Sequence, residues 1–318
     1  MKVVVLGAGA LGSILAGHLA RAGEDVTLIA RGARANYLQH NGVTITGLVD
    51  FTIPCAVVTD PARLSHADVC VVTVKTYDMI SALASMRHLA VSSVLSVQNG
   101  VLKNEQLATV FGREKVLGAT AVLSGEVLPA GPVRFTVNQG ISIGELPQGI
   151  SERVTRLVGT LESAGIRAEA TEQIQAAEWS KFVGWVGWTT LAVLTRLETY
   201  KFLSDAATAV VGVRLMRETA ALATQMGVPL EDNPPFNVKT IAAVSEQQAV
   251  EILQETGTKM GSRAPTHRMS GLQDLERGRR LEVEETLGYV VTKAGEQGVP
   301  VPTVETCYRL ISGLNRFV

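Results

Sequence analysis

The sequence is poor in cysteine, and this argues against two kinds of architecture. Only three of the 318 residues are cysteines, Cys55, Cys70 and Cys307, and no pair has C-x-x-C spacing. Neither a disulfide framework nor a structural zinc site is therefore indicated. So little cysteine is typical of a reducing compartment, and we expect a cytoplasmic protein without a bound metal.

An excess of charge of either sign is also missing. The chain has 29 Lys and Arg against 30 Asp and Glu, which gives a formal net charge of -1. A nucleic-acid-binding protein would need a basic stripe. The basic clusters are short, and one of them, Arg277 to Arg280, is flanked by Glu276 and Glu282, so we interpret them as solvated helix surface and expect no nucleic-acid partner.

Long hydrophobic runs suited to a membrane are lacking as well. The stretch from Phe182 to Leu194 is shorter than the roughly 20 residues that span a bilayer. The apolar stretch from Val3 to Ala20, after Lys2, has the outline of a signal peptide, but its glycines have the spacing of a phosphate-binding loop. We therefore expect no membrane association, and a buried helix at Phe182.

Hydrophobic patterning indicates two domains. A strand at Lys2–Leu6, a glycine loop, a helix to about Ala22 and a strand at Asp25–Ala30 form a βαβ unit. Later β-type runs occur at 69–74, 94–97 and 116–122, and two shorter ones, at 133–137 and 141–144, predict an added antiparallel hairpin. From about Glu172 the period is helical. We predict an α/β fold: a doubly wound, parallel Rossmann-type domain over 1–171, then an all-α substrate and catalytic domain over 172–318.

The glycine loop predicts a dinucleotide site. Its six residues fit G-x-G-x-x-G between a strand and a helix: Gly7, Ala8, Gly9, Ala10, Leu11 and Gly12. In such loops the glycines permit the tight turn, the approach of the pyrophosphate and close packing of helix on strand. The phosphates then meet the positive end of the helix dipole.

The end of the second strand distinguishes the two nicotinamide cofactors. An NAD enzyme usually has Asp or Glu there, whereas this chain reads Ile29-Ala30-Arg31-Gly32. Arg31 can pair with a 2'-phosphate through its planar fork. We therefore predict NADP(H) as the cofactor.

Several polar residues are candidates for the chemistry. Lys75 and Asn99 each follow a predicted strand, at the carboxyl edge of the sheet where ligands bind in open α/β folds. Lys181 begins an otherwise apolar helix, where it either reaches solvent along its stem or faces a cleft as a proton donor of lowered pKa. Taken alone, Glu282, among Arg279, Arg280 and Glu284, is interpreted as solvated helix surface.

Taken together, these motifs resemble the ketopantoate reductase (2-dehydropantoate 2-reductase) family over essentially the whole chain. The matching segments are G-x-G-A-x-G at Gly7–Gly12, Arg31 after strand two, V-K-T at Val74–Thr76, Q-N-G at Gln98–Gly100, Glu178-Trp179-x-Lys181, and L-Q-D-L-E-R-G-R at Leu272–Arg279. The resemblance implies that Lys181 donates the proton, Glu282 helps to bind the substrate's hydroxyl or ketone, and Ser270 holds its carboxylate. Lys75 and Asn99 would line the cofactor and substrate cleft.

The sequence departs from the family where the substrate would bind. Members typically have asparagines one and two turns after the catalytic lysine, and these positions are Trp185 and Thr189 here. Loss of an amide that pairs with a substrate hydroxyl changes discrimination strongly. Trp185 and Thr189 would then line the substrate site, unless Trp185 turns into the core.

The resemblance implies reduction of ketopantoate to pantoate, for pantothenate synthesis, by hydride transfer from NADPH. One alternative is a related reductase for a more apolar ketone or imine, and another is a dinucleotide-binding regulator without catalysis. The expected partner is a small 2-oxo acid. The sequence leaves the oligomeric state open, with a homodimer as one alternative.

Overall fold

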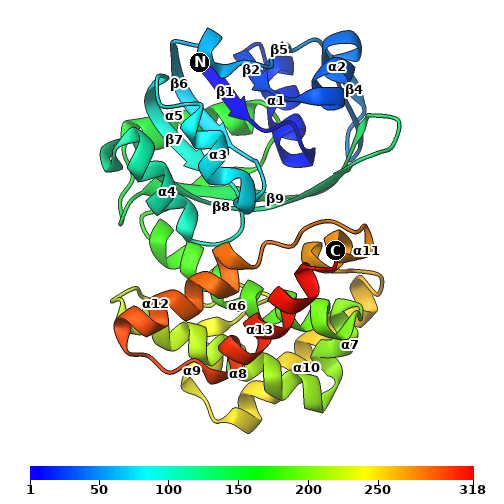
Figure 1. Ribbon diagram of the computed structural model, residues 1–318, viewed down its shortest axis with the longest axis vertical. Coiled ribbons are helices and arrows are strands. Elements are labelled where there is room, and N and C mark those ends of the chain that lie inside the picture. The colour runs from blue at the N-terminus through cyan, green and yellow to red at the C-terminus, as the bar shows by residue number, and fades with distance from the viewer. The chain divides into compact units, whose positions relative to one another are not determined.

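The computed structural model describes residues 1–318 and divides into two compact units, each with its own core (Figure 1). Unit 1 comprises Met1–Asn99 and Lys103–Gln175, and unit 2 comprises Gly100–Leu102 and Ala176–Val318. Unit 1 is mixed α/β and unit 2 is helical, so the predicted fold class is confirmed.

A five-stranded parallel sheet forms the centre of unit 1. Its strands lie in the order β5-β2-β1-β6-β7 and span Ala56–Val58, Asp25–Ile29, Lys2–Leu6, His66–Val72 and Ala90–Ser96. Side chains alternate between its two faces, because Val3 and Val5 join one apolar cluster while Val4 and Leu6 join another. Both faces are therefore buried, which explains why these strands read as continuous apolar runs.

Helices cover both faces of this sheet (Figure 1). One face is buried with α1 and α5, which contribute Leu15 and Leu157 to its cluster. The other is buried with α3 and α4, which contribute Leu83 and Leu107. The helices of this unit span Ala10–Arg21 (α1), Gly32–Asn41 (α2), Met79–Ala84 (α3), Leu102–Phe111 (α4) and Glu152–Ser163 (α5), with short 3-10 turns at Pro61–Arg63, Thr76–Asp78 and Arg113–Lys115.

A second sheet in unit 1 corrects one prediction. The runs at 133–137 and 141–144 do not form a hairpin with each other but belong to one strand, β9 (Val133–Glu145), which pairs antiparallel with β8 (Leu117–Val127). The break between the runs is a bulge around Gly140, whose φ is 132°. The glycine that indicated a turn thus accommodates an irregular register. The sheet is completed by β3 (Val43–Gly47), β4 (Phe51–Ile53) and β10 (Ala168–Ala170).

Unit 2 is built around α6, which is surrounded by other elements on nearly every side. Gly184 faces Phe236, Gly187 faces Met216 of α8, and the ring of Trp179 lies 6.3 Å from that of Tyr289 of α12, tilted by 51°. A helix enclosed in this way needs the apolar composition that the sequence shows. The helices span Ile174–Thr195 (α6), Thr199–Ser204 (α7), Ala206–Gln225 (α8), Val238–Ala243 (α9), Glu246–Arg263 (α10), Ser270–Glu276 (α11), Tyr289–Gln297 (α12) and Pro302–Asn315 (α13), with a π-helical turn at Glu284–Gly288.

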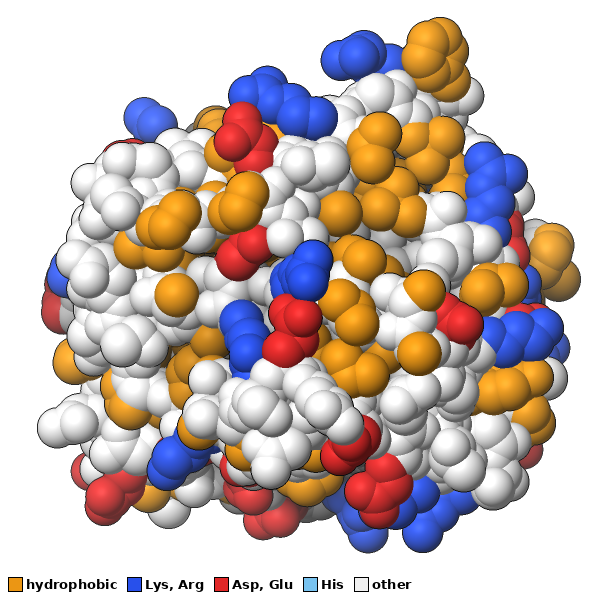
Figure 2. All heavy atoms as spheres, turned by 90° about the horizontal axis from the view of Figure 1, so that it is seen from below, with side chains coloured by type: hydrophobic (Ala, Val, Ile, Leu, Met, Phe, Trp, Pro, Cys, Tyr) orange, Lys and Arg blue, Asp and Glu red, His pale blue; other side chains and the backbone are white.

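No helix of the structure has both the length and the apolar character of a membrane span, and this includes the 22-residue α6. On the face that Figure 2 shows, basic and acidic side chains are interspersed with apolar ones. No basic stripe of the kind that follows a nucleic-acid backbone is seen on that face.

Candidate active site

The glycine loop between β1 and α1 has the geometry that its sequence predicts. Gly7 has φ of 113°, and a Cβ there would lie 2.9 Å from Cγ1 of Val74. A Cβ at Gly12 would overlap with the carbonyl oxygen of Gly7 and lie 2.5 Å from Oγ1 of Thr73. Neither position accepts a side chain without movement of the backbone.

Gly9 differs from its two neighbours in the motif, because nothing lies within 4 Å of where its Cβ would be. Gly9 is exposed and is the N-cap residue of α1, with no side chain capping the helix. Open space above the uncapped N-terminus of a helix suits an anionic group that must approach the backbone closely. The loop residues therefore fit a dinucleotide pyrophosphate; Ala8 lies in the turn, and Ala10 and Leu11 begin α1.

Arg31 follows the end of β2 after one intervening residue and is the N-cap residue of α2. Its side chain is exposed, whereas Ile29 and Ala30 just before it are buried. Asp25, the acidic residue of this strand, lies at the opposite end. The carboxyl end of β2 thus presents a cation and no carboxylate.

Lys75 and Asn99 follow neighbouring strands of the parallel sheet, as predicted. The N–H of Val97 donates to the carbonyl of Val72 at 3.2 Å, so β6 and β7 remain paired to their carboxyl ends. Beyond them, Nε2 of Gln98 donates to the carbonyl of Val74 at 2.6 Å. This bond ties the segment that carries Lys75 to the segment that carries Asn99.

Lys103 is a polar residue of this region that the sequence analysis missed. It is 4% exposed, and its Nζ donates to the carbonyls of Gln98 at 3.0 Å and Ala119 at 2.6 Å. A buried ammonium held by carbonyls fixes the position of the peptide that leads into Asn99. Only the neighbouring Q-N-G motif hinted at it, because both acceptors belong to the backbone.

In unit 2, Lys181, Trp185 and Thr189 lie at i, i+4 and i+8 on α6 and therefore share one face of the helix. Lys181 is half-buried, Trp185 is 6% exposed and Thr189 is 8% exposed. The hydroxyl of Thr189 has no hydrogen-bond partner. A buried hydroxyl without a partner is costly. Trp188 Nε1 and Thr190 Oγ1 of the same helix also lack a partner, so this feature is not confined to the face of Lys181.

Ser270 and Glu282 come from the segment that follows α10. Ser270 is exposed and begins α11, and the next residue, Gly271, faces the Thr189 methyl group, since a Cβ there would lie 2.8 Å from it. Glu282 is partly exposed between Leu281 and Val283, which are both buried in the core of unit 2. It lies two residues before the start of the π-helical turn, an irregularity that is frequent at functional sites.

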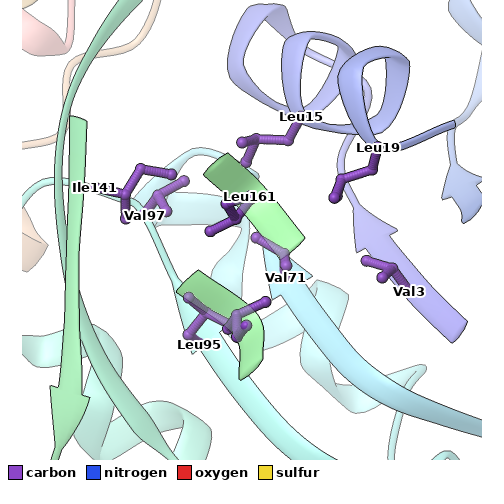
Figure 3. A pocket seen from close by; sticks show the side chains of 9 residues that line it. Val3, Leu15, Leu19, Val71, Leu95, Val97, Ile141 and Leu161 are labelled. Carbon is purple, nitrogen blue, oxygen red and sulfur yellow. The ribbon is translucent and has the colours of Figure 1, made fainter. Parts of the chain in front are cut away.

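A cavity in unit 1 is not part of this site. It is lined only by apolar side chains, which lie between the first sheet, α1, α5 and β9 (Figure 3): Val3, Leu15, Leu19, Val71, Leu95, Val97, Ile141, Leu157 and Leu161. Without a polar group it offers nothing to orient a charged ligand. We interpret it as a packing gap of the core.

Two family models match the chain one after the other. The model described as ketopantoate reductase PanE/ApbA matches residues 3–148, and the model described as ketopantoate reductase PanE/ApbA C terminal matches residues 173–315. Together they span nearly the whole chain, and they include every candidate site residue named above.

Similar proteins carry the same description. The chain is 29% identical over 315 residues to the 2-dehydropantoate 2-reductase of Pyrococcus abyssi, with 98% of this chain and 97% of that protein covered. It is 28% identical to that of Archaeoglobus fulgidus, with coverages of 98% and 97%. A crystal structure of a PanE/ApbA family ketopantoate reductase from Ralstonia eutropha JMP134 matches with a TM-score of 0.83 at 27% identity, with 99% of each chain covered.

Proposed function

The chain belongs to the ketopantoate reductase family, and on this basis we propose that it catalyses the NADPH-dependent reduction of a 2-oxo acid, with 2-dehydropantoate as the first candidate. Family membership makes it an oxidoreductase that acts on CH–OH groups and uses a nicotinamide dinucleotide. The choice of NADPH, the substrate and the role of each residue are our proposals.

The observation that carries the proposal is the half-buried Lys181 on the predominantly apolar α6, whose only other charged residue is Glu178. A reduced nicotinamide supplies a hydride when it is bound, and the 2-oxo oxygen then needs a proton. Nζ of Lys181 donates that proton, so one hydride and one proton convert the 2-oxo group into a 2-hydroxyl group. Glu282 binds the same oxygen and Ser270 holds the substrate carboxylate.

In unit 1 the proposed roles are those of binding. The backbone of Gly7–Gly12 receives the pyrophosphate and Arg31 receives the 2'-phosphate. Lys75 and Asn99, whose segments Gln98 ties together, contact the cofactor, and Asn99 also contacts the substrate.

A second candidate substrate, a more apolar 2-oxo acid, is favoured by one observation. The indole of Trp185 is the first large side chain after Lys181 on the same face of α6, where relatives typically have an amide. An indole adds apolar contact area and accepts no hydrogen bond. The unpartnered hydroxyl of Thr189 leaves only one small polar group beyond it.

One assay tests both candidates. The purified protein is supplied with NADPH and a panel of 2-oxo acids, from ketopantoate to acids with apolar side chains, and the absorbance of NADPH is followed. We expect turnover with at least one acid, and its loss in Lys181→Ala. The absence of turnover with every 2-oxo acid would contradict the proposed reaction, while the order of kcat/KM values identifies the preferred class.

A further inference from the structure

Arg34 connects three separate segments of unit 1. It lies on α2, three residues after Arg31, and is partly buried. Its Nε donates to the carbonyl of Ala8 at 3.0 Å, its Nη2 donates to Oγ of Ser13 at 2.9 Å, and its Nη1 donates to the carbonyl of Gly131. All three guanidinium nitrogens are thus engaged, which offsets the cost of burying a cation.

The carbonyl of Ala8 is held from two directions. Besides Arg34, the hydroxyl of Ser13 donates to it at 3.2 Å, and this hydroxyl in turn accepts the bond from Nη2 of Arg34. Ser13 is fully buried, so water does not compete for these bonds. The two donors and the carbonyl form a closed triangle whose orientation is fixed by α1 and α2.

Fixing this carbonyl also fixes the amide on the other side of the same peptide plane. In a trans peptide the C=O of one residue and the N–H of the next point in opposite directions. The N–H of Gly9 is therefore directed away from Arg34, and no backbone carbonyl of the chain accepts it. Gly9 is also the residue with open space above its Cα.

We propose that Arg34 is a positioning residue for the dinucleotide: it holds the Ala8 carbonyl so that the N–H of Gly9 is aimed at the pyrophosphate before the cofactor arrives. The proposal rests on the proposed function, because it needs a dinucleotide on this loop. Preorganised donors bind more tightly because less ordering is left for the binding step.

The turn between β8 and β9 keeps Arg34 in place. Figure 1 shows this long hairpin ending beside α2. Gly131 in the turn has φ of 103°, and a Cβ there would overlap with the ring of Tyr37. The same ring lies 5.3 Å from the guanidinium carbon of Arg34. Arg34 is thus enclosed by Tyr37 and the hairpin turn, and its rotamer is restricted.

Arg31 and Arg34 lie on the same helix, but the proposal gives them different signatures. Arg31 would contact the 2'-phosphate, which only NADPH has. Arg34 acts on the pyrophosphate, which NADPH and NADH share. Loss of Arg34 should therefore weaken both cofactors by the same factor, whereas loss of Arg31 should weaken NADPH alone.

The experiment measures dissociation constants of NADPH and NADH, without substrate, by the fluorescence of the bound nicotinamide. The variants are Arg34→Met, Arg31→Met and Ser13→Ala, with the exposed Arg63→Met of the same unit as the control. We expect Arg34→Met to raise both constants about tenfold and Ser13→Ala to raise both about threefold. Arg63→Met should leave both unchanged. At saturating NADPH the kcat of Arg34→Met should return to near the unaltered value.

Three results would overturn the proposal. Selective weakening of NADPH by Arg34→Met would make Arg34 a direct 2'-phosphate ligand, and unchanged constants would make it purely structural. If thermal melting shows that Arg34→Met is unfolded, Arg34→Lys and Ser13→Ala decide instead, and unchanged constants in both would have the same meaning. Failure of the unaltered protein to bind either dinucleotide would overturn the proposed function together with this inference.

Discussion

The candidate functional groups of unit 1 differ in kind from those of unit 2. In unit 1 the cofactor region is made mainly of backbone: three glycines, the N-terminus of α1 and carbonyls held by Arg34 and Lys103. In unit 2 the candidate groups are side chains, Lys181 above all, on a helix enclosed by apolar neighbours. We infer that mutations of the closely packed glycines of unit 1 should affect folding and binding together, whereas mutation of Lys181 in unit 2 should change the chemistry without changing stability.

The largest expected effect belongs to unit 2. Lys181→Ala should lower turnover by roughly 10² to 10⁴ fold, because the developing alkoxide loses its proton donor. Cofactor affinity and melting temperature should change little, since the side chain is half-buried and belongs to no apolar cluster. Steady-state kinetics and calorimetry check this, with the exposed Lys259→Ala as the control. Near-normal turnover would show that Lys181 is not the proton donor and that its side chain only reaches solvent.

Unit 1 should show the opposite behaviour at Gly12. A Cβ there meets the carbonyl of Gly7, which belongs to the backbone and cannot turn aside. Gly12→Ala should therefore reduce the free energy of unfolding by about 3 kcal/mol. Gly9→Ala is the matched control, since φ is -68° and the space is open. It should fold normally and still bind cofactor more weakly. Equal melting temperatures for the two variants would contradict the comparison.

The next largest effect is expected at Trp185 and Thr189 of α6, the two candidates for substrate binding. Trp185→Asn combined with Thr189→Asn should raise the ratio of kcat/KM for ketopantoate to kcat/KM for apolar 2-oxo acids by roughly 10- to 100-fold. The two amides would form hydrogen bonds with the substrate hydroxyl, which the apolar acids lack. Trp185 is also part of the core of unit 2, so the melting temperature must be followed. An unchanged ratio in a folded variant would show that Trp185 has only a packing role.

A variant at Arg31 tests whether a single side chain sets the preference between NADPH and NADH in a region that otherwise binds through backbone groups. NADPH should bind the unaltered protein about tenfold more tightly than NADH, which corresponds to about 1.4 kcal/mol. Arg31→Ala should abolish most of this preference and leave NADH binding as it was. Equal affinity of the unaltered protein for the two cofactors would refute the assignment of NADPH.

The smallest effect is a dependence of stability on pH that arises in unit 1. Burial lowers the pKa of His18 below its usual 6.5, and the ring, 4% exposed, lies edge-on to Phe51 and Phe135. The unfolded chain then binds a proton more readily than the folded one. The contribution of His18 is therefore complete above pH 6.5 and is lost as the pH falls below it.

Denaturant titrations at pH 7 and pH 5 should show a loss of about 1 kcal/mol, and His18→Gln should remove most of it while keeping the bond to the Ala164 carbonyl. Partial burial of the ring also lowers the pKa of His267 in unit 2, but this residue as a whole is more exposed than His18 and should contribute less. An unchanged pH dependence in His18→Gln would contradict the assignment to His18.

The sequence predicted correctly those elements whose structure depends on a few neighbouring residues. The first strand, Lys2–Leu6, was predicted with its observed bounds, and the glycine loop follows it as expected, because both depend on patterns of a few residues. The candidate residues Lys75 and Asn99 follow neighbouring paired strands for the same reason. The roles of the site residues stay predictions until the variants are measured.

Arg34 and Lys103 escaped the sequence analysis because their partners are distant carbonyls. Any residue has a carbonyl, so the acceptors Gly131 and Ala119 leave no trace in the sequence. The long hairpin of β8 and β9 was missed for a related reason. A glycine such as Gly140 occurs both in bulges and in turns, so the sequence does not distinguish the two.

The enclosed turn of the β8–β9 hairpin has a consequence for protein engineering. Tips of hairpins are usually chosen for inserting tags, fluorophores or new termini, because such loops tolerate additions. Here the tip contacts Tyr37 and Arg34, so an insertion near Gly131 would disturb a contact that leads to the glycine loop.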